Sequence, residues 1–377
     1  MTGRRTSSQA CPDPGDGERP MMKKLYSVAA ALAFLSLAVS TAFAQDWERA
    51  VSLFNQKQYR QAIREFHAVL RSNPDYYQAW YYIGAGHFQL QGYEDAADAL
   101  QKYVAAAQKD EKGQATGYLY IGLAHYQLKQ YDKAIPALAK HLSLSEKLQQ
   151  KPETSARAAL GRAYIFTERF NEAVPVLTAA AAETKTDSNT YYYLGYAHQK
   201  LGRSDQAIAA LNQGITVNPK DADSLLLLGN IHLGQMKQNP AALKQAISAG
   251  ERLVAVRDDE SAWSLLGQAY LFDKQYAKAA PLLDKYARAH QDSGAAWLNL
   301  GLAYSRSSQW KQAAEALEQA SKLAPTNTSL LLELGYVYES DKQYDKALSA
   351  YERAYEASGK SDESARSSIE RVKQAKP

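Results

Sequence analysis

Cysteine is the scarcest feature of this sequence: among 377 residues there is one, Cys11. A single cysteine cannot form a disulfide within the chain, and it cannot build a zinc site from several thiolates. Cys11 also lies in an N-terminal segment that we expect to be absent from the mature protein. The mature chain would then have no cysteine nucleophile, and other residue types must supply its stability and chemistry.

An excess of charge of one sign is also missing. The 44 Lys and Arg residues nearly balance the 40 Asp and Glu residues, which leaves a net charge of +4. Nucleic acid usually requires a concentrated basic face, so we expect no nucleic-acid partner. The sequence also lacks a glycine-rich phosphate loop, a Gly-x-Ser-x-Gly elbow and a His-Glu-x-x-His motif. These absences predict a protein that is not an enzyme and uses no cofactor and no metal.

Long apolar runs are absent except near the start of the chain. Lys23 and Lys24 precede an apolar stretch at residues 25–39, and Ala42-Phe43-Ala44 then matches the small-x-small cleavage pattern. This stretch is shorter than the roughly 20 residues that span a bilayer. We therefore predict a signal peptide at 21–44, cut after Ala44, and a periplasmic or otherwise exported protein; an uncleaved anchor is the alternative. Residues 1–20 are predicted to be an upstream extension with a misassigned start.

What the rest of the chain has in abundance is self-similarity. A small residue recurs at nearly constant spacing, at Ala50, Gly84, Gly122, Gly161, Gly195, Gly229, Gly267, Gly301 and Gly335. The successive intervals are 34, 38, 39, 34, 34, 38, 34 and 34 residues. A fixed period of this length indicates one structural unit that is copied along the chain.

One copy shows the whole pattern. A tryptophan, a Leu-Gly pair and a tyrosine are followed by small, large and proline positions: Trp297, Leu300, Gly301, Tyr304, Ala313, Leu317 and Pro325. This pattern resembles the tetratricopeptide repeat, and the resemblance covers residues 45–357. It implies an all-α fold, a right-handed α-solenoid of about nine helix-turn-helix repeats. Residues 358–377 are predicted to form a C-terminal capping helix with Ser361 as its N-cap.

The small residues explain how such helices pair. The glycine of each first helix lets the second helix approach closely, and large residues, mostly aromatic, are predicted to fill the turn end of each pair. These turn residues are Tyr59, Tyr93, Tyr131, Phe170, Tyr276, Trp310 and Tyr344. Extra residues near 109–113, 149–153 and 236–240 are predicted to lie in loops.

Four histidines occupy the position that is tyrosine in the motif: His87, His125, His198 and His232. We interpret them as half-buried aromatic residues with a polar edge, because a metal site usually needs three or four converging ligands. A metal or pH-sensitive pair formed by His87 and His125 is the alternative. The carboxylates at Asp258, Asp259 and Glu260 are predicted to lie in a solvated loop between repeats.

The resemblance also implies where a partner would bind. First-helix positions three before, one after and four after the small residue line the inner groove of such repeats. The candidate peptide-binding residues at these positions are Tyr81, Phe88, Tyr126, Tyr192, Tyr196, Asn230, Gln268 and Tyr336. An aromatic groove on a rigid scaffold suits the side chains of a bound protein or peptide segment. We therefore predict a protein-interaction scaffold in the cell envelope; an adaptor in polysaccharide assembly that contacts glycan, or an enzyme using the insertions, are the alternatives.

Overall fold

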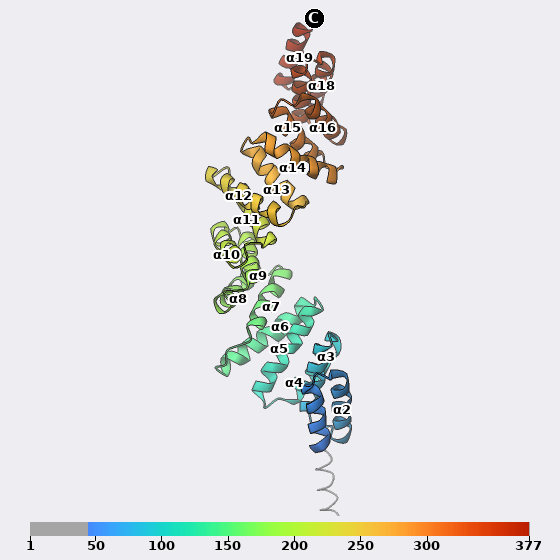
Figure 1. The fold of residues 1–377 in the computed structure, drawn as a ribbon, viewed down its shortest axis with the longest axis vertical. Helices are drawn as coiled ribbons and strands as arrows, with labels where there is room; N and C mark the ends of the chain where they lie inside the picture. Colours follow the sequence, from blue (N-terminus) through green and yellow to red (C-terminus); the bar gives the residue numbers. More distant parts are fainter. Residues whose placement is uncertain (1–43, 377) are drawn as a thin grey trace, which may run out of the picture. The chain divides into compact units, whose positions relative to one another are not determined.

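The computed structural model describes residues 44–376, which form helices and no strand (Figure 1). The helices are α1 (44–55), α2 (Tyr59–Ser72), α3 (Gln78–Gln89), α4 (Tyr93–Ala106), α5 (Glu111–Gln127), α6 (Tyr131–Lys147), α7 (Thr154–Phe166), α8 (Phe170–Glu183), α9 (Ser188–Lys200), α10 (Ser204–Val217), α11 (Ala222–Gln235), α12 (Pro240–Val256), α13 (Glu260–Phe272), α14 (Tyr276–Ala289), α15 (Gly294–Arg306), α16 (Trp310–Leu323), α17 (Thr328–Ser340), α18 (Tyr344–Ala357) and α19 (Glu363–Ala375). Odd-numbered helices from α1 to α17 are the first helices of repeats, and the following even-numbered helices are their partners. The predicted all-α, repeat-built solenoid is confirmed.

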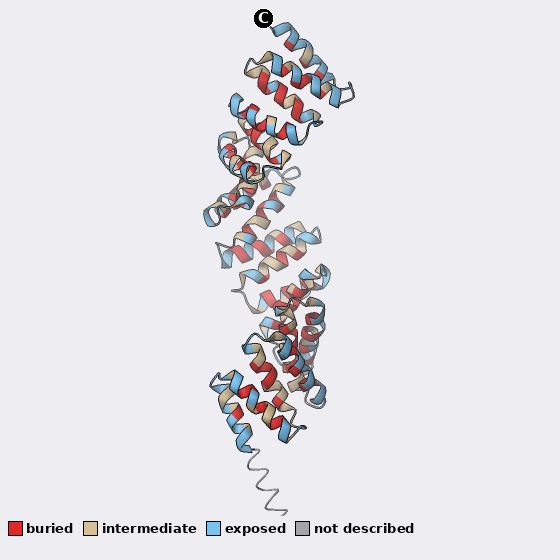
Figure 2. Cartoon of the chain, turned by 90° about the vertical axis from the view of Figure 1, so that its right-hand side faces the viewer, coloured by how far each residue is buried: buried red, intermediate tan, exposed pale blue. Residues whose placement is uncertain are grey.

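The chain divides into two compact units, one ending at Ala163 and one beginning at Tyr164. Within each unit a helix packs against the helices before and after it in the sequence, from α2 to α6 in the first and from α8 to α19 in the second. First helices of neighbouring repeats also contact each other, as α9 does α11 and α13 does α15. Buried residues lie on the helix faces that meet in these contacts (Figure 2). The core is therefore a series of adjacent layers, as expected when no single helix pair can bury its apolar face alone.

In several repeats the glycine of the first helix lies against the second helix, whereas Gly229 of α11 lies against Leu265 of α13, the next first helix. A Cβ atom added at Gly195 in α9 would lie 2.7 Å from the Leu211 side chain of α10 and 3.3 Å from the backbone oxygen of Ala207. Gly301 of α15 and Leu317 of α16 repeat this contact, with 2.6 Å from the added Cβ to the leucine. The predicted role of the glycines as the point of helix contact is therefore present in these repeats.

The turn within a repeat has a recurring backbone conformation. Its residue before the second helix's N-cap has a positive φ in most repeats, at Lys57, Gln91, Lys129, Glu168, Gly202, Lys274, Ser308 and Lys342. The next N–H then bonds back to the first helix, as Gln275 N does to the Tyr270 carbonyl at 2.9 Å. The left-handed conformation turns the chain so that the following N–H can bond to a carbonyl that the helix end leaves without a partner. The predicted turn aromatics are the first residues of the second helices, such as Tyr276 of α14 and Trp310 of α16.

The first helices of many repeats begin with a side-chain cap. The N-cap residues that accept a bond from a backbone N–H are Asp110, Asp187, Asp221, Asp259, Ser293 and Asn327. The acidic run at 258–260 therefore does more than face solvent, since Asp259 accepts from Ala262 N at 3.0 Å. Asp258 accepts from the Trp263 indole and from Lys285, and these two bonds, the indole first, lower the pKa of its carboxyl.

The predicted loop stretches are largely confirmed, because 109–110, 149–153 and 236–239 lie between helices, whereas 111–113 belong to α5 and Pro240 begins α12. The repeats with extra residues also have longer helices, which the sequence analysis did not predict. The helices α5, α6 and α12 each have 17 residues, whereas α9 and α13 have 13 and α10 and α14 have 14. The added length of these repeats therefore lies largely in their helices. Three or four residues are about one helical turn, so the insertion keeps the apolar side of the helix facing its partner.

The last helix, α19, packs on α18. Its N-cap is Asp362, which accepts from Ala365 N at 2.8 Å, and the prediction that Ser361 caps this helix is wrong. Ala365 and Val372 are fully buried, and Arg371 donates two hydrogen bonds of 2.8 Å to Glu339 of α17. This helix covers the apolar side of the last repeat and leaves a polar outer face.

The predicted upstream extension, 1–20, lies outside the described residues, and so does the signal peptide predicted at 21–44 except for Ala44. Over residues 44–376 no helix combines the length and the apolar character needed to cross a bilayer.

Candidate functional site

The predicted groove residues all lie on first helices, but the structure divides them into separate groups. In the first unit, Tyr81 and Phe88 of α3 both contact Tyr120 of α5, with ring centroids 6.4 and 5.3 Å apart. Tyr81 also packs against Tyr103 of α4 at 5.5 Å. Burial, followed by the neighbouring tyrosines, raises the pKa of Tyr81 to about 12. These two predicted residues therefore join an aromatic cluster that ties neighbouring repeats together.

Tyr126 of α5 is only partly buried, and its ring lies 5.7 Å from that of Tyr131, at the turn of its own repeat. It contributes to the turn end of the pair, where the sequence predicted Tyr131 alone. No described contact brings Tyr126 together with Tyr81 or Phe88.

Two of the candidate residues, Tyr192 and Tyr196 of α9, lie beside each other. They are one helical turn apart, and their rings stack with centroids 6.3 Å apart. They line a pocket of about 430 Å³ in the second unit, together with Ile165, Phe166, Glu168, Phe170, Tyr193 and Asp223. We call this hollow the aromatic pocket. Its walls come from α7, the turn before α8, the first residue of α8, α9 and the first turn of α11.

Carboxylates give the aromatic pocket a negative character. Burial and then Asp223 are the largest causes that raise the pKa of Tyr192, and Asp221 adds to them. Asp223 forms an ion pair with Arg257 at 2.9 Å, but Arg257 also pairs with Asp259 at 2.8 Å. One guanidinium is therefore shared by two carboxylates, so these three groups together carry a net negative charge.

Asn230 lines a second, more polar pocket of about 370 Å³. Its other lining residues are Leu226, Glu260, Ser261, Ser264, Leu265, Tyr286 and His290. Glu260 and His290 lie 3.0 Å apart at this pocket, and Gln268, another predicted residue, donates a 2.8 Å hydrogen bond to Ser264. Asn230 and Ser264 therefore line one pocket, and Gln268 is bonded to one of its lining residues. We call this hollow the polar pocket.

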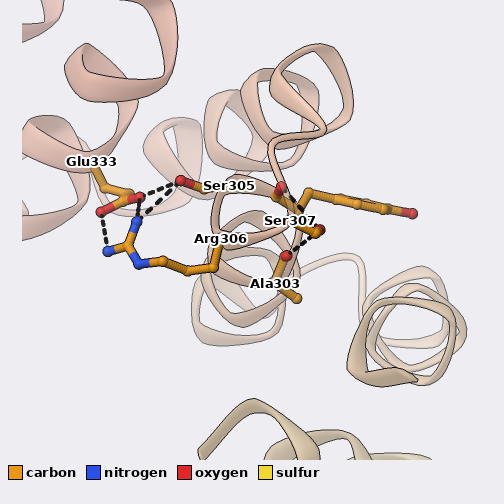
Figure 3. A network of polar contacts seen from close by, with 6 residues as sticks. Ala303, Ser305, Arg306, Ser307 and Glu333 are labelled. Carbon is orange, nitrogen blue, oxygen red and sulfur yellow. Dashed lines mark hydrogen bonds and ion pairs between the residues drawn. The ribbon is translucent and has the colours of Figure 1, made fainter. Parts of the chain in front are cut away.

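Tyr336 of α17 stands apart from both pockets. It is 45% exposed, and its ring lies 6.0 Å from Trp310 and 6.0 Å from the Arg306 guanidinium. Arg306 itself is held by the carboxylate of Glu333, as Figure 3 shows. Tyr336 is accessible but has no second aromatic residue of its own helix beside it, in contrast to Tyr192 and Tyr196.

Sequence reasoning missed part of the aromatic pocket. Phe166 lies five residues after Gly161 and is 45% exposed, Tyr193 is next to a predicted residue, and Asp223 begins the following first helix. Phe170 was assigned only to the turn. A phenylalanine five residues after the glycine is the sequence pattern that could have pointed to Phe166. Phe272 has the same spacing but lies outside this pocket.

The four motif histidines are buried or partly buried. His232 is 5% exposed, and burial lowers its pKa. His125 bonds through Nδ1 to Gln130 at 2.9 Å, and His87 lies 3.6 Å from Asp95. Within the described part of the chain no group of three or more His, Cys, Asp or Glu residues converges as a metal site would require.

Comparison with known proteins agrees with the helix pairs. Models of the tetratricopeptide repeat match residues 48–111, 115–148, 156–189, 188–221, 264–306 and 298–362. No curated protein sequence matches the chain.

Solved structures resemble it over about half its length. One is YrrB, described as a TPR protein with an unusual peptide-binding site, with 16% identity over 52% of this chain and 97% of its own, and a TM-score of 0.47. Another is MamA AMB-1, with 25% identity over 47% of this chain and 94% of its own, and a TM-score of 0.42. The repeat models, the paired helices and the glycine contacts agree, and the chain belongs to the tetratricopeptide repeat family.

Proposed function

We propose that this protein is a non-catalytic interaction scaffold of the bacterial cell envelope, which binds a segment of a protein partner along the first helices of its second unit. The aromatic pocket is the observation that carries the proposal. Its five rings are exposed or only partly buried, and four of them lie on α8 and α9, which pack on each other while α9 also packs on α10 and α11. Rigid aromatic side chains supply large contact area at low entropic cost, which is typical of sites that anchor protein partners.

The arrangement of two pockets favours an extended ligand. The aromatic pocket includes Asp223, at the start of α11, and the polar pocket includes Leu226 and Asn230 of the same helix. A segment that places one side chain in the aromatic pocket would therefore pass over α11 toward the polar pocket. Asn230, Ser261 and Ser264 offer hydroxyl and amide groups that can bond to the segment's backbone.

The proposal is tested by affinity capture from a cell-envelope extract, with the bound proteins identified by mass spectrometry. The Tyr192→Ala, Tyr196→Ala double variant is expected to lose a partner that the unchanged protein retains. Each tyrosine is only partly buried, so we expect the variant to fold. Circular dichroism and a thermal melt check that it does.

Phe166 and Phe272 provide a matched control. Each lies five residues after the glycine of its first helix, and they are 45% and 48% exposed. Phe166→Ala should weaken capture because Phe166 lines the aromatic pocket, whereas Phe272→Ala should leave it unchanged. Equal capture by all variants would refute the proposal, and retention of isolated envelope glycan with no protein partner would favour a glycan-contacting adaptor instead.

A further inference from the structure

We propose that the aromatic pocket selects a cationic side chain, an arginine, from the segment that it binds. This inference rests on the proposed function and names the chemistry of that same site. It depends on the number of ring faces, on the carboxylates beside them and on a cation that the protein itself already holds against one of these rings.

The rings form a connected series around the hollow. Phe166 contacts Tyr193 at 5.9 Å, Tyr193 contacts Tyr192 at 5.2 Å, and Tyr192 stacks on Tyr196 at 6.3 Å. Phe170 completes the series at 6.2 Å from Tyr196. Most neighbouring pairs are edge-on, at 67 to 72°, so their faces point in different directions. Faces with different directions around one hollow can contact a guanidinium from more than one side.

The charged groups beside the rings are negative and would attract a cation. Glu168 and Asp223 are the charged residues of the pocket lining, and both are acidic. The neighbouring Arg257 divides its interaction between Asp223 and Asp259, so it does not cancel the negative charge. An anionic side chain would meet two carboxylates here, and a purely apolar one would leave them without a partner from the ligand.

The protein contains an internal example of this interaction. The ammonium of Lys200, one turn after Tyr196 in α9, lies 5.3 Å from the centre of the Tyr196 ring. Lys200 does not line the pocket, so it leaves the hollow open to a second cation. Arginine suits the site better than lysine, because its planar guanidinium stacks on rings, is weakly hydrated and bonds to a carboxylate through two N–H groups.

The test uses three synthetic ten-residue peptides of glycine and serine that differ only in a central arginine, citrulline or norleucine. Binding is followed by NMR of ring-labelled tyrosine, and Tyr→Phe variants at 192, 193 and 196 assign the pocket signals. The arginine peptide should shift these signals with about tenfold higher affinity than the citrulline peptide, which has nearly the same shape but no charge. Asp223→Asn should lower arginine binding severalfold.

Asp284→Asn is the matched control, since it removes an aspartate that pairs with Arg288 at 2.8 Å, as Asp223 does with Arg257, but lies outside the pocket. Equal binding of arginine and citrulline peptides, or no shift of the pocket signals, would overturn this inference. If capture of a partner still depended on Tyr192 and Tyr196, the proposed function would stand without it. Selective arginine binding with no pocket-dependent partner would instead refute the proposed function alone.

Discussion

Leu211 of α10 lies against Gly195 of α9 so closely that a methyl group added to the glycine would be 2.7 Å from the leucine Cγ. The leucine is fully buried, and it belongs to a core cluster that includes Leu225 and Leu228 of the next first helix. One glycine therefore controls both the spacing of a helix pair and the packing of that pair on its neighbour.

Substituting this glycine is expected to destabilise the protein. Gly195→Ala should lower the free energy of unfolding by about 1–3 kcal/mol, because a packed core resists an added methyl group. Gly234→Ala is the control: it also lies in a helix, no atom is within 4 Å of its added Cβ, and alanine should stabilise the helix by about 0.5–1 kcal/mol. Urea unfolding followed by circular dichroism measures both, and equal effects at the two sites would contradict the packing account.

The turns give a second pair of opposite effects. Lys274 has φ of 61° and Gly202 has φ of 71° at the same position of their repeats. Lys274→Gly should raise the free energy of unfolding by about 0.5–1 kcal/mol, because only glycine adopts this backbone without a steric penalty. Gly202→Ala should lower it by about 1 kcal/mol although nothing lies near its added Cβ. Thermal melts of the two variants would show shifts of opposite sign.

Buried histidines predict a loss of stability in mild acid. Burial lowers the pKa of His232, and burial followed by Arg203 lowers that of His198. The unfolded chain therefore binds protons more readily than the folded one as the pH falls below the ordinary histidine value of 6.5. The midpoint of thermal unfolding should fall between pH 7.5 and 5.5, through the window from 6.5 down to the lowered pKa values. His232→Phe should reduce this fall, and an unchanged pH dependence in the variant would exclude His232 as a cause.

A charged contact joins two first helices near the C-terminal end. Arg306 of α15 bonds to Glu333 of α17 through both Nη atoms, at 2.6 and 3.0 Å, and Ser305 donates to the same carboxylate at 2.6 Å (Figure 3). Because Arg306 is 42% exposed and solvent screens the pair, a double-mutant cycle with Arg306→Ala and Glu333→Ala should give a coupling energy of about 1 kcal/mol. The coupling should weaken in 1 M salt, and a value of zero in low salt would show that the contact adds no stability.

The predicted export signal has a direct readout. N-terminal sequencing of the protein recovered from a periplasmic fraction should begin at Gln45, because Ala42-Phe43-Ala44 fits the cleavage pattern. Ala44→Arg should block cleavage and leave a longer, membrane-retained chain. Recovery of unprocessed protein from the cytoplasm would refute the predicted location.

Much of the fold could be predicted because each repeat needs small and aromatic residues at the same positions, and these recur in the sequence. A glycine marks where two helices touch, and an aromatic residue such as Tyr276 marks the start of a second helix. The extra residues were less readable, since a run of three or four residues does not show whether it forms a loop or another helical turn. In the structure α5, α6 and α12 are longer than the corresponding helices of other repeats, and packing against neighbouring helices decides where this added length lies.

The candidate site was only partly predictable. Tyr192 and Tyr196 could be paired because residues four apart share one side of a helix. Tyr81 occupies the same repeat position as Tyr192, three residues before the glycine, yet it packs with Phe88 into a cluster around Tyr120. Whether an aromatic residue is covered depends on the neighbouring repeat, whose contacts are not local in the sequence.

The repeat period, the helix pairing and the membership of the family were determined by the sequence itself, because each follows from local spacing of small and large side chains. Only the tertiary structure decided that Phe166, Tyr192 and Asp223 line one pocket while Phe272 lies outside it. These three residues come from three different first helices, and stacking of the repeats sets their separation. Local sequence patterns therefore determine the repeat and its helix pair, whereas contacts between repeats determine which residues line the pocket.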